Sequence, residues 1–211
     1  MELILASSSA RRRELLPLLG VSFRAAASGA SEKFRPGQKP ENVACFLALK
    51  KACAVARRYP RCVMLGADTL VVMGKRILGK PRSRKEALDM LNSLRGKRHR
   101  VITGLALVRP GKPPLRAYCV TQVVMRNYSS SEMERYVDAG KAWDKAGAYA
   151  MQDRAFHPVA SFSECACNVI GLPLATTARL LKKAGLKTKP NRSRLRSLCR
   201  YCHQHVRKGQ S

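Results

Sequence analysis

Acidic residues are scarce in this sequence of 211 residues, where 13 Asp and Glu stand against 41 Lys and Arg and give a formal net charge of +28. Long apolar runs are absent too, and none approaches the roughly 20 residues that a membrane-spanning helix needs. The first residues lack a basic segment followed by an apolar one, so we expect no signal peptide, no membrane contact and a cytoplasmic protein. With 45% hydrophobic residues, the chain can bury one sizeable core or form two lobes.

The basic charge is spread along the whole chain. Residues 186–211 contribute eight basic and no acidic side chains, which leaves +20 on residues 1–185. A field of this sign attracts nucleotides, nucleic acid or anionic lipid, and it does not specify a fold. A general bias of the proteome toward lysine and arginine explains the charge as well as a nucleic-acid role does. We expect residues 186–211 to form a basic, mobile C-terminal tail.

The eight cysteines do not indicate a disulfide framework, because the chain is long and shows no export signal. The Cys-x-x-Cys-His motif at residues 199–203 matches the spacing of a haem-attachment site, and His205 could extend it to a metal site. Covalent haem attachment requires export, and a zinc site built on one short cluster lacks a second pair of ligands. We therefore interpret the motif as accidental, and Cys165 and Cys167 as packing residues.

Hydrophobic periodicity predicts strands and helices that alternate along the chain. The expected strands are 2–6, 21–27, 62–67, 69–73, 99–108, 115–126 and 159–163, and the expected helices are 11–20, 40–58, 83–94, 130–139 and 173–184. Residues 28–39 and 140–158 are expected to be loops. This alternation, with one antiparallel pair in the middle, predicts an α/β fold with a mixed central β-sheet flanked by helices.

A polar turn at Ser7, Ser8 and Ser9 lies between the first strand and the first helix, and Arg11 and Arg12 follow it. Backbone N–H groups at a helix N-terminus suit phosphate, and guanidinium groups add forked donors matched to phosphate oxygens. The turn therefore predicts a phosphate site. An ordinary helix start with solvated arginines is the alternative.

Asp68 lies between two apolar segments, where a buried carboxylate must be paired or bound to metal. A turn-forming Asp is the alternative. Lys51, at the edge of the apolar face of its helix, and Lys80, in a Gly-Lys-Pro turn, can reach an anionic substrate or extend to water. Gln152 follows a segment of small residues and can contact a base edge, although a flexible loop explains that segment equally well.

Several separated motifs, in one order, resemble those of the Maf family, the septum-formation-inhibitor-like proteins. These motifs are Leu5–Leu16, Gly66–Thr69, Leu78–Pro81, His99–Gly104, Asp144–Tyr149 and Asn168–Pro173. The resemblance covers about residues 3–184, so we expect one Maf-like domain over residues 1–185.

The resemblance implies two lobes around a deep nucleotide-binding cleft, commonly in a homodimer. It also implies hydrolysis of a nucleoside triphosphate between the α- and β-phosphates, dependent on a divalent cation, Mg²⁺ or Mn²⁺. The implied substrate-binding residues are Ser7, Ser9, Arg11, Arg12, Thr69 and Gln152, and the implied catalytic residues are Asp68, Glu32, Lys51 and Lys80. Of these, Glu32 and Asp68 would hold the metal or activate water.

Arg11, Thr69 and Gln152 resemble the set that marks the dTTP/UTP branch of the family. The sister branch, which acts on methylated guanine nucleotides, typically has Gln after the Asp, and it stays an alternative. Ser31 and Asp153 depart from the family pattern, which bears on metal binding and turnover. A further alternative is a non-catalytic module that binds nucleic acid through its basic surface.

Overall fold

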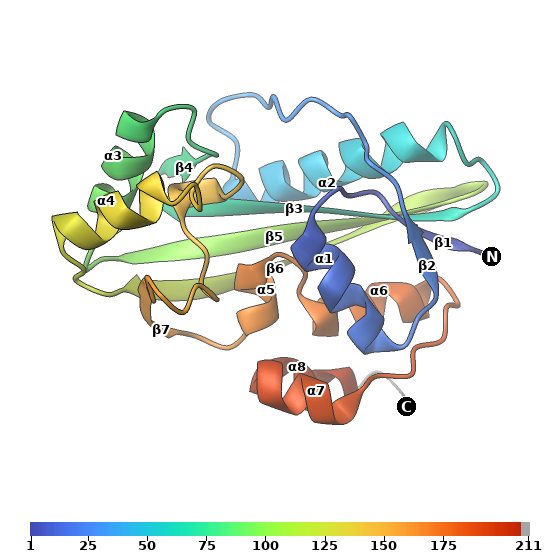
Figure 1. The fold of residues 1–211 in the computed structure, drawn as a ribbon. Coiled ribbons are helices and arrows are strands. Elements are labelled where there is room, and N and C mark those ends of the chain that lie inside the picture. Colours follow the sequence, from blue (N-terminus) through green and yellow to red (C-terminus); the bar gives the residue numbers. More distant parts are fainter. Residues whose placement is uncertain (208–211) are drawn as a thin grey trace. The chain divides into compact units, whose positions relative to one another are not determined.

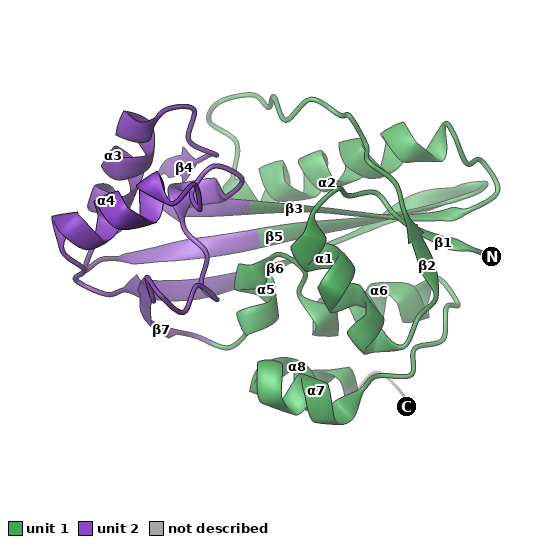
Figure 2. Cartoon of the chain, viewed as in Figure 1, with its two compact units in different colours: residues 1–69, 103–119, 164–211 green, residues 70–102, 120–163 purple. Residues whose placement is uncertain are grey.

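A computed structural model describes residues 1–207 of the chain, which divides into two compact units (Figure 2). Unit 1 comprises Met1–Thr69, Thr103–Cys119 and Glu164–Ser211, and unit 2 comprises Leu70–Ile102 and Val120–Ser163. Each unit is therefore assembled from segments that lie far apart in the sequence.

The described elements follow the alternation that the sequence predicts (Figure 1). In chain order they are β1 (Leu3–Leu5), α1 (Ala10–Leu15), η1 (Leu16–Leu19), β2 (Phe23–Ala25), α2 (Pro40–Ala56), β3 (Val63–Met73), β4 (Arg76–Leu78), α3 (Arg84–Leu94), β5 (Arg98–Arg109), β6 (Lys112–Met125), α4 (Ser130–Asp138), η2 (Ala146–Ala148), β7 (Val159–Phe162), α5 (Ala166–Ile170), α6 (Leu174–Lys183), α7 (Arg192–Leu198) and α8 (Arg200–Arg207).

Within residues 1–207 the strands form a seven-stranded sheet in the order β2-β1-β3-β5-β6-β7, with β4 paired to β3. Strand β1 pairs in parallel with both β2 and β3. After each strand a helical connection carries the chain back to the end of the sheet at which that strand began, so the next strand runs in the same direction. Strand β4 runs antiparallel to β3, and β7 runs antiparallel to β6. The predicted α/β fold with a mixed sheet is confirmed.

One difference from the expected elements concerns Asp68. Residues 62–67 and 69–73 were expected as two strands, but β3 is continuous from Val63 to Met73 and contains Asp68 as a buried residue. The alternative of a turn-forming Asp is therefore wrong. A strand can carry a buried carboxylate only where another group pairs with it, and the sequence around Asp68 does not show that partner.

Two glycines let α2 lie close to the strands of unit 1. A Cβ on Gly66 of β3 would lie 2.1 Å from the carbonyl oxygen of Ala48, and one on Gly104 of β5 would lie 2.2 Å from the backbone of the same helix. Gly66 and Asp68 share a face of β3, while Lys51 lies one turn after Ala48 on α2. The close packing therefore brings Lys51 to the face of the strand that carries Asp68.

The sequence predicts a basic, mobile tail over residues 186–211, and the structure describes two helices, α7 and α8, within residues 192–207. Helix α7 packs against α8, and α8 packs against α6 (Figure 1). The buried side chains of this segment are Leu195, Cys199, Cys202 and Val206. These side chains belong to two short helices separated by an extended residue, Cys199, whereas Arg194, Arg196 and Arg200 are exposed. Two cysteines among the buried positions made the apolar pattern difficult to recognise beside so many arginines.

None of the helices in the described part of the chain is long and apolar enough to cross a membrane.

Unit 2 contains a buried histidine, His99, whose side chain faces Tyr149. The Nε2 atom of His99 lies 2.7 Å from the Tyr149 hydroxyl oxygen, and the two rings meet edge to face. Within residues 1–207, the Nδ1 atom of His99 has no hydrogen-bond partner. Burial lowers the pKa of His99 from 6.5 to about 4, because the charged imidazolium would lose its hydration.

We expect His99 to make the protein less stable in acid. Between pH 6.5 and about 4 the unfolded chain binds a proton at His99 that the folded chain does not, so stability falls as pH falls through this window. The loss reaches about 3 kcal/mol at its limit. Urea unfolding across this window should show a smaller pH dependence in His99→Gln than in the wild type. The exposed His157, changed to Asn, is the control, and equal slopes for wild type and His99→Gln would contradict the assignment.

Candidate active site

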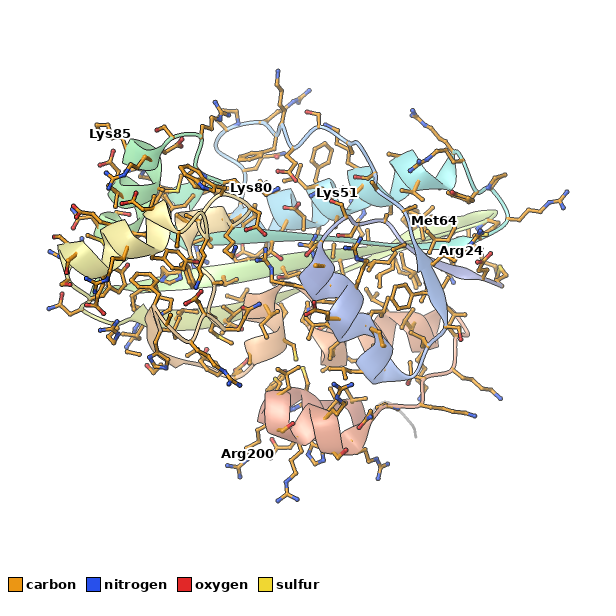
Figure 3. All side chains as sticks on the ribbon, in the orientation of Figure 1. Arg24, Lys51, Met64, Lys80, Lys85 and Arg200 are labelled. Atoms are coloured by element: carbon orange, nitrogen blue, oxygen red, sulfur yellow. The ribbon has the colours of Figure 1, made fainter. Side chains whose placement is uncertain are left out.

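Three charged side chains meet in unit 1. The Nζ atom of Lys51 lies 2.5 Å from Oδ1 of Asp68 and 2.8 Å from Oε1 of Glu32. Lys51 comes from α2 (Figure 3), Asp68 comes from β3, and Glu32 comes from the loop between β2 and α2. The lysine ammonium therefore bridges two carboxylates that are distant in sequence.

The position of Asp68 changes its proton affinity. The residue is only 5% exposed, and burial raises its pKa. The positive charges of Lys51 and Arg12 act in the opposite direction, and the nearby Glu32 raises the pKa further. A carboxylate with an increased proton affinity, still held by a lysine, is suited to orient water or accept a proton from it.

Arg12 is anchored by groups from separate segments of unit 1. Its Nε donates to the carbonyl oxygen of Gly171 at 2.8 Å, and one terminal nitrogen donates to the hydroxyl of Thr69 at 3.0 Å. The other terminal nitrogen lies 3.4 Å from Oγ of Ser7. Burial lowers the pKa of Arg12 and the Asp68 carboxylate opposes that shift, but an arginine stays protonated in either case. The guanidinium is thus a fixed positive charge beside the carboxylates.

Hydroxyl groups extend this anchor through unit 1. Thr69 Oγ1 lies 2.9 Å from Oγ1 of Thr103, which in turn donates to the carbonyl oxygen of Asn168 at 3.1 Å. The donors can all point one way, from Arg12 to Thr69, then to Thr103, then to Asn168, and such chains polarise one another. This chain explains why three separate motifs, on β3, on β5 and on α5, are needed to position one arginine.

The predicted phosphate turn has a definite local structure. Ser7 is buried, and its Oγ accepts a hydrogen bond from the backbone N–H of Ser9 at 3.2 Å. Ser9 precedes α1, and within the described residues its side chain makes no capping hydrogen bond. Arg11 lies half-buried in the first turn of α1, directly before Arg12. The turn therefore presents hydroxyl and backbone donors on the same segment as two arginines.

Lys80 and Gln152 belong to unit 2, where both are exposed. The two loops that carry them are joined, because the N–H of Gly147 donates to the carbonyl oxygen of Gly79 at 2.9 Å. Gly147 has a φ of 70°, and a Cβ there would lie 2.9 Å from the side chain of Val71. The small residues before Gln152 are thus required for close backbone packing.

Asp153 and Ser31, the departures from the family pattern, have local roles. One carboxylate oxygen of Asp153 accepts from the backbone N–H of Phe156 at 2.8 Å, and the other lies 3.1 Å from Nζ of Lys141. Asp153 therefore stabilises the turn that follows Gln152. Ser31 is exposed and precedes Glu32 in its loop.

The acidic residues of unit 1 fit a divalent cation. Carboxylate oxygens are the preferred ligands of Mg²⁺ and Mn²⁺. Glu32 and Asp68 already share one positively charged group, the ammonium of Lys51, which shows that their oxygens can face a single cation. These two side chains are therefore the candidate metal ligands.

Sequence reasoning assigned no role to Thr103, Asn168 or Gly171, although all three lie within the motifs that it recognised. Each contributes a hydroxyl or carbonyl oxygen to the anchor of Arg12. The signal available in the sequence was that all three residues lie inside motifs of the family pattern. The contacts themselves link residues that are far apart in sequence, so only the fold shows them.

The fold and these side chains define an α/β protein with carboxylate, lysine and arginine groups gathered in unit 1. The sequence profile of the family described as Maf-like protein matches residues 2–184, and the chain belongs to this Maf family. The resemblance that the motifs indicated is therefore confirmed.

Three curated relatives carry the name dTTP/UTP pyrophosphatase. The dTTP/UTP pyrophosphatase of Thermomicrobium roseum is 43% identical over 204 residues, which cover 96% of this chain and 93% of the relative. The dTTP/UTP pyrophosphatases of Pelotomaculum thermopropionicum and Symbiobacterium thermophilum are 43% and 45% identical; each alignment covers 87% of this chain, with 97% and 94% of those relatives.

Solved structures show a more distant likeness. The Ham1 protein of Staphylococcus aureus superimposes with a TM-score of 0.44 at 13% identity, covering 60% of this chain and 73% of that protein. A HAM1 protein of Coxiella burnetii gives a TM-score of 0.41 at 16% identity, covering 61% and 74%. Scores of this size carry no argument about function.

Proposed function

We propose that this protein hydrolyses the pyrimidine nucleoside triphosphates dTTP and UTP to a nucleoside monophosphate and pyrophosphate, in control of the nucleotide pool. The observation that carries the proposal is the buried Asp68 carboxylate, held by Lys51 beside Glu32 and the anchored Arg12. The relatives named dTTP/UTP pyrophosphatase, at 41–45% identity, support the choice of substrate.

In the proposed reaction the oxygen of water forms a bond to the α-phosphorus, and the bond from that phosphorus to the bridging oxygen breaks. Asp68 orients the water and accepts its proton, because burial increases the proton affinity of this carboxylate. Pyrophosphate leaves with the electron pair of the broken bond. The Asp68 carboxylate therefore takes the proton from the water oxygen as that oxygen bonds to the α-phosphorus.

Cations do most of the remaining work, since phosphoryl transfer depends on positioning and on charge stabilisation. Arg12 and Arg11 bind phosphate oxygens together with Ser7 and Ser9. Lys51 and Lys80 neutralise charge that develops on those oxygens. A divalent cation held by Glu32 and Asp68, Mg²⁺ or Mn²⁺, would supply further charge neutralisation when bound.

Two residues are proposed to set substrate choice in different ways. The Thr69 hydroxyl already bonds Arg12 and Thr103, so it acts by positioning the arginine. Gln152 is exposed and carries both a donor and an acceptor, which suits the edge of a pyrimidine base. Gln152 is therefore the residue proposed to contact the base.

A panel of nucleoside triphosphates tests the activity. With Mg²⁺ or Mn²⁺, we expect pyrophosphate release from dTTP and UTP to exceed that from other triphosphates in kcat/KM. Gln152→Ala should reduce this preference about 10-fold, the effect of one lost hydrogen bond. Gln204→Ala, at an exposed position of α8, is the control. Preference for a methylated guanine nucleotide would overturn the branch, and absence of cleavage of every triphosphate would overturn the activity.

Homodimer formation, nucleic-acid binding and a cytoplasmic location stay predictions from the sequence and the resemblance.

A further inference from the structure

Four buried cysteines gather in unit 1 where α8 meets α5. Cys165 immediately precedes α5 and Cys167 lies within it, whereas Cys199 immediately precedes α8 and Cys202 lies within it. All four are at most 3% exposed. The fold thus brings a Cys-x-Cys pair and a Cys-x-x-Cys pair together from distant parts of the sequence.

The distances between the sulfurs fit ligands of one metal ion. The Sγ atom of Cys165 lies 3.4 Å from that of Cys202 and 4.0 Å from that of Cys199, and all three sulfurs lie within 4.8 Å of one another. Tetrahedral Zn²⁺ with Zn–S bonds of about 2.3 Å places its sulfurs about 3.8 Å apart. A disulfide needs about 2.05 Å between sulfurs. All eight cysteines are free thiols in this structure.

Cys167 is the candidate for the fourth ligand. It is fully buried beside Cys165 and its thiol interacts with those of Cys165, Cys199 and Cys202, although its sulfur is not among the three that lie within 4.8 Å of one another. Cys119, on β6, hydrogen-bonds to the thiol of Cys165 alone within this group. Cys119 is also only half-buried, whereas Cys167 is buried, so Cys167 is the better candidate.

A backbone donor faces one sulfur of this group. The backbone N–H of Cys202 donates to Sγ of Cys199 at 3.4 Å. Backbone donors of this kind support thiolate ligands in metal sites. Arg200, which follows Cys199 and is labelled in Figure 3, adds positive charge next to a centre that would carry excess negative charge.

We propose that these four cysteines bind one zinc ion in a closed, structural site that fastens α7 and α8 to α5. Four thiolates complete the tetrahedral shell and leave no position for a substrate, so the site is structural rather than catalytic. The family profile ends at residue 184, before the second cysteine pair. The site is thus formed between the family domain and the C-terminal helices of this chain.

The zinc site also supports the arginine of the proposed active site. Cys165 and Cys167 hold the start of α5, and the same short segment offers the carbonyl oxygens of Asn168 and Gly171 to Thr103 and Arg12. Loss of the metal should loosen this segment. Only this consequence rests on the proposed function; metal binding itself is measured without any substrate.

Zinc content tests the proposal directly. The full-length protein, purified under reducing conditions without chelator, should contain about one zinc per chain by atomic emission. After exchange, Co²⁺ should give the intense visible bands of a tetrahedral thiolate site. The zinc content of Cys202→Ser should be lower than that of the wild type by a factor of about 10 or more. Its melting temperature should be about 6–12 °C lower. Cys53→Ser, on α2, is the control and should retain zinc and melt like the wild type.

Some results would overturn the proposal. Wild-type protein that neither contains zinc nor takes up Co²⁺ under reducing conditions would do so, and this measurement does not require any variant to fold. An intact mass lower by two hydrogens, restored by reductant, would replace the metal site with a disulfide. Loss of zinc in Cys119→Ser but not in Cys167→Ser would overturn the assignment of the fourth ligand. Cleavage of dTTP has no bearing on any of these outcomes.

Discussion

Asp68→Asn is expected to lower kcat for dTTP about 10³-fold, while the protein keeps its stability. The substitution removes the proposed proton acceptor but preserves the shape of the side chain. An asparagine oxygen can still accept from Lys51, which also retains Glu32 at 2.8 Å. Because burial raises the pKa of Asp68, the ionised form costs stability above that pKa, and the neutral amide removes this cost. The free energy of unfolding should change by less than about 1 kcal/mol.

The measurement pairs steady-state kinetics with urea unfolding at one pH. Asp138→Asn is the matched control, since Asp138 is an acid of unit 2 that pairs with Arg84 through 2.7 Å between Oδ1 and Nε. The control should leave kcat unchanged. Turnover of Asp68→Asn close to that of the wild type would contradict the proposed role, and a large loss of stability would indicate a structural role instead.

Arg12→Lys is expected to lower kcat/KM about 100-fold although the positive charge is kept. A lysine cannot reproduce the forked donation of Arg12 to Gly171 and Thr69, so its ammonium is not held toward the phosphates. Thr69 and Thr103 lose the donor that begins their hydrogen-bond chain. The effect should appear in both kcat and KM, because the arginine both binds and positions the phosphates.

Arg13→Lys provides the control for Arg12→Lys. Arg13 is the next residue of α1 and is exposed, so the same chemical change there should leave kcat/KM unchanged. Equal losses in the two variants would indicate that general positive charge, rather than the anchored guanidinium, attracts the substrate. A salt titration separates the two cases, since long-range attraction weakens with ionic strength and a direct contact weakens much less.

The arrangement of elements could largely be predicted because its signals are local. Apolar periodicity placed α2, α4 and α6 within a few residues of their observed bounds. It failed at Asp68, where an acidic residue interrupts the apolar pattern of β3 without interrupting the strand. It failed again at α7 and α8, where cysteines supply part of a buried face in a segment dominated by arginine.

The candidate site was only partly predictable. Ordered motifs indicated Asp68, Glu32, Lys51 and Arg12, but motifs do not show which charges pair. The 2.5 Å contact between Lys51 and Asp68 depends on two glycines, Gly66 and Gly104, that let α2 pack closely against the strands. Nothing in the sequence around either glycine indicates that α2 is the element packed against it.

The sequence by itself determined the α/β class, the family and the residue types for phosphate chemistry. Periodicity and short motifs are patterns among residues that are close together in the chain, so they can be recognised without the fold. Only the tertiary structure decided the anchor of Arg12, the bridge at Lys51 and the meeting of the two cysteine pairs. Each of these joins side chains from separate segments, and it exists only where packing excludes water and brings those segments within hydrogen-bonding or ligand distance.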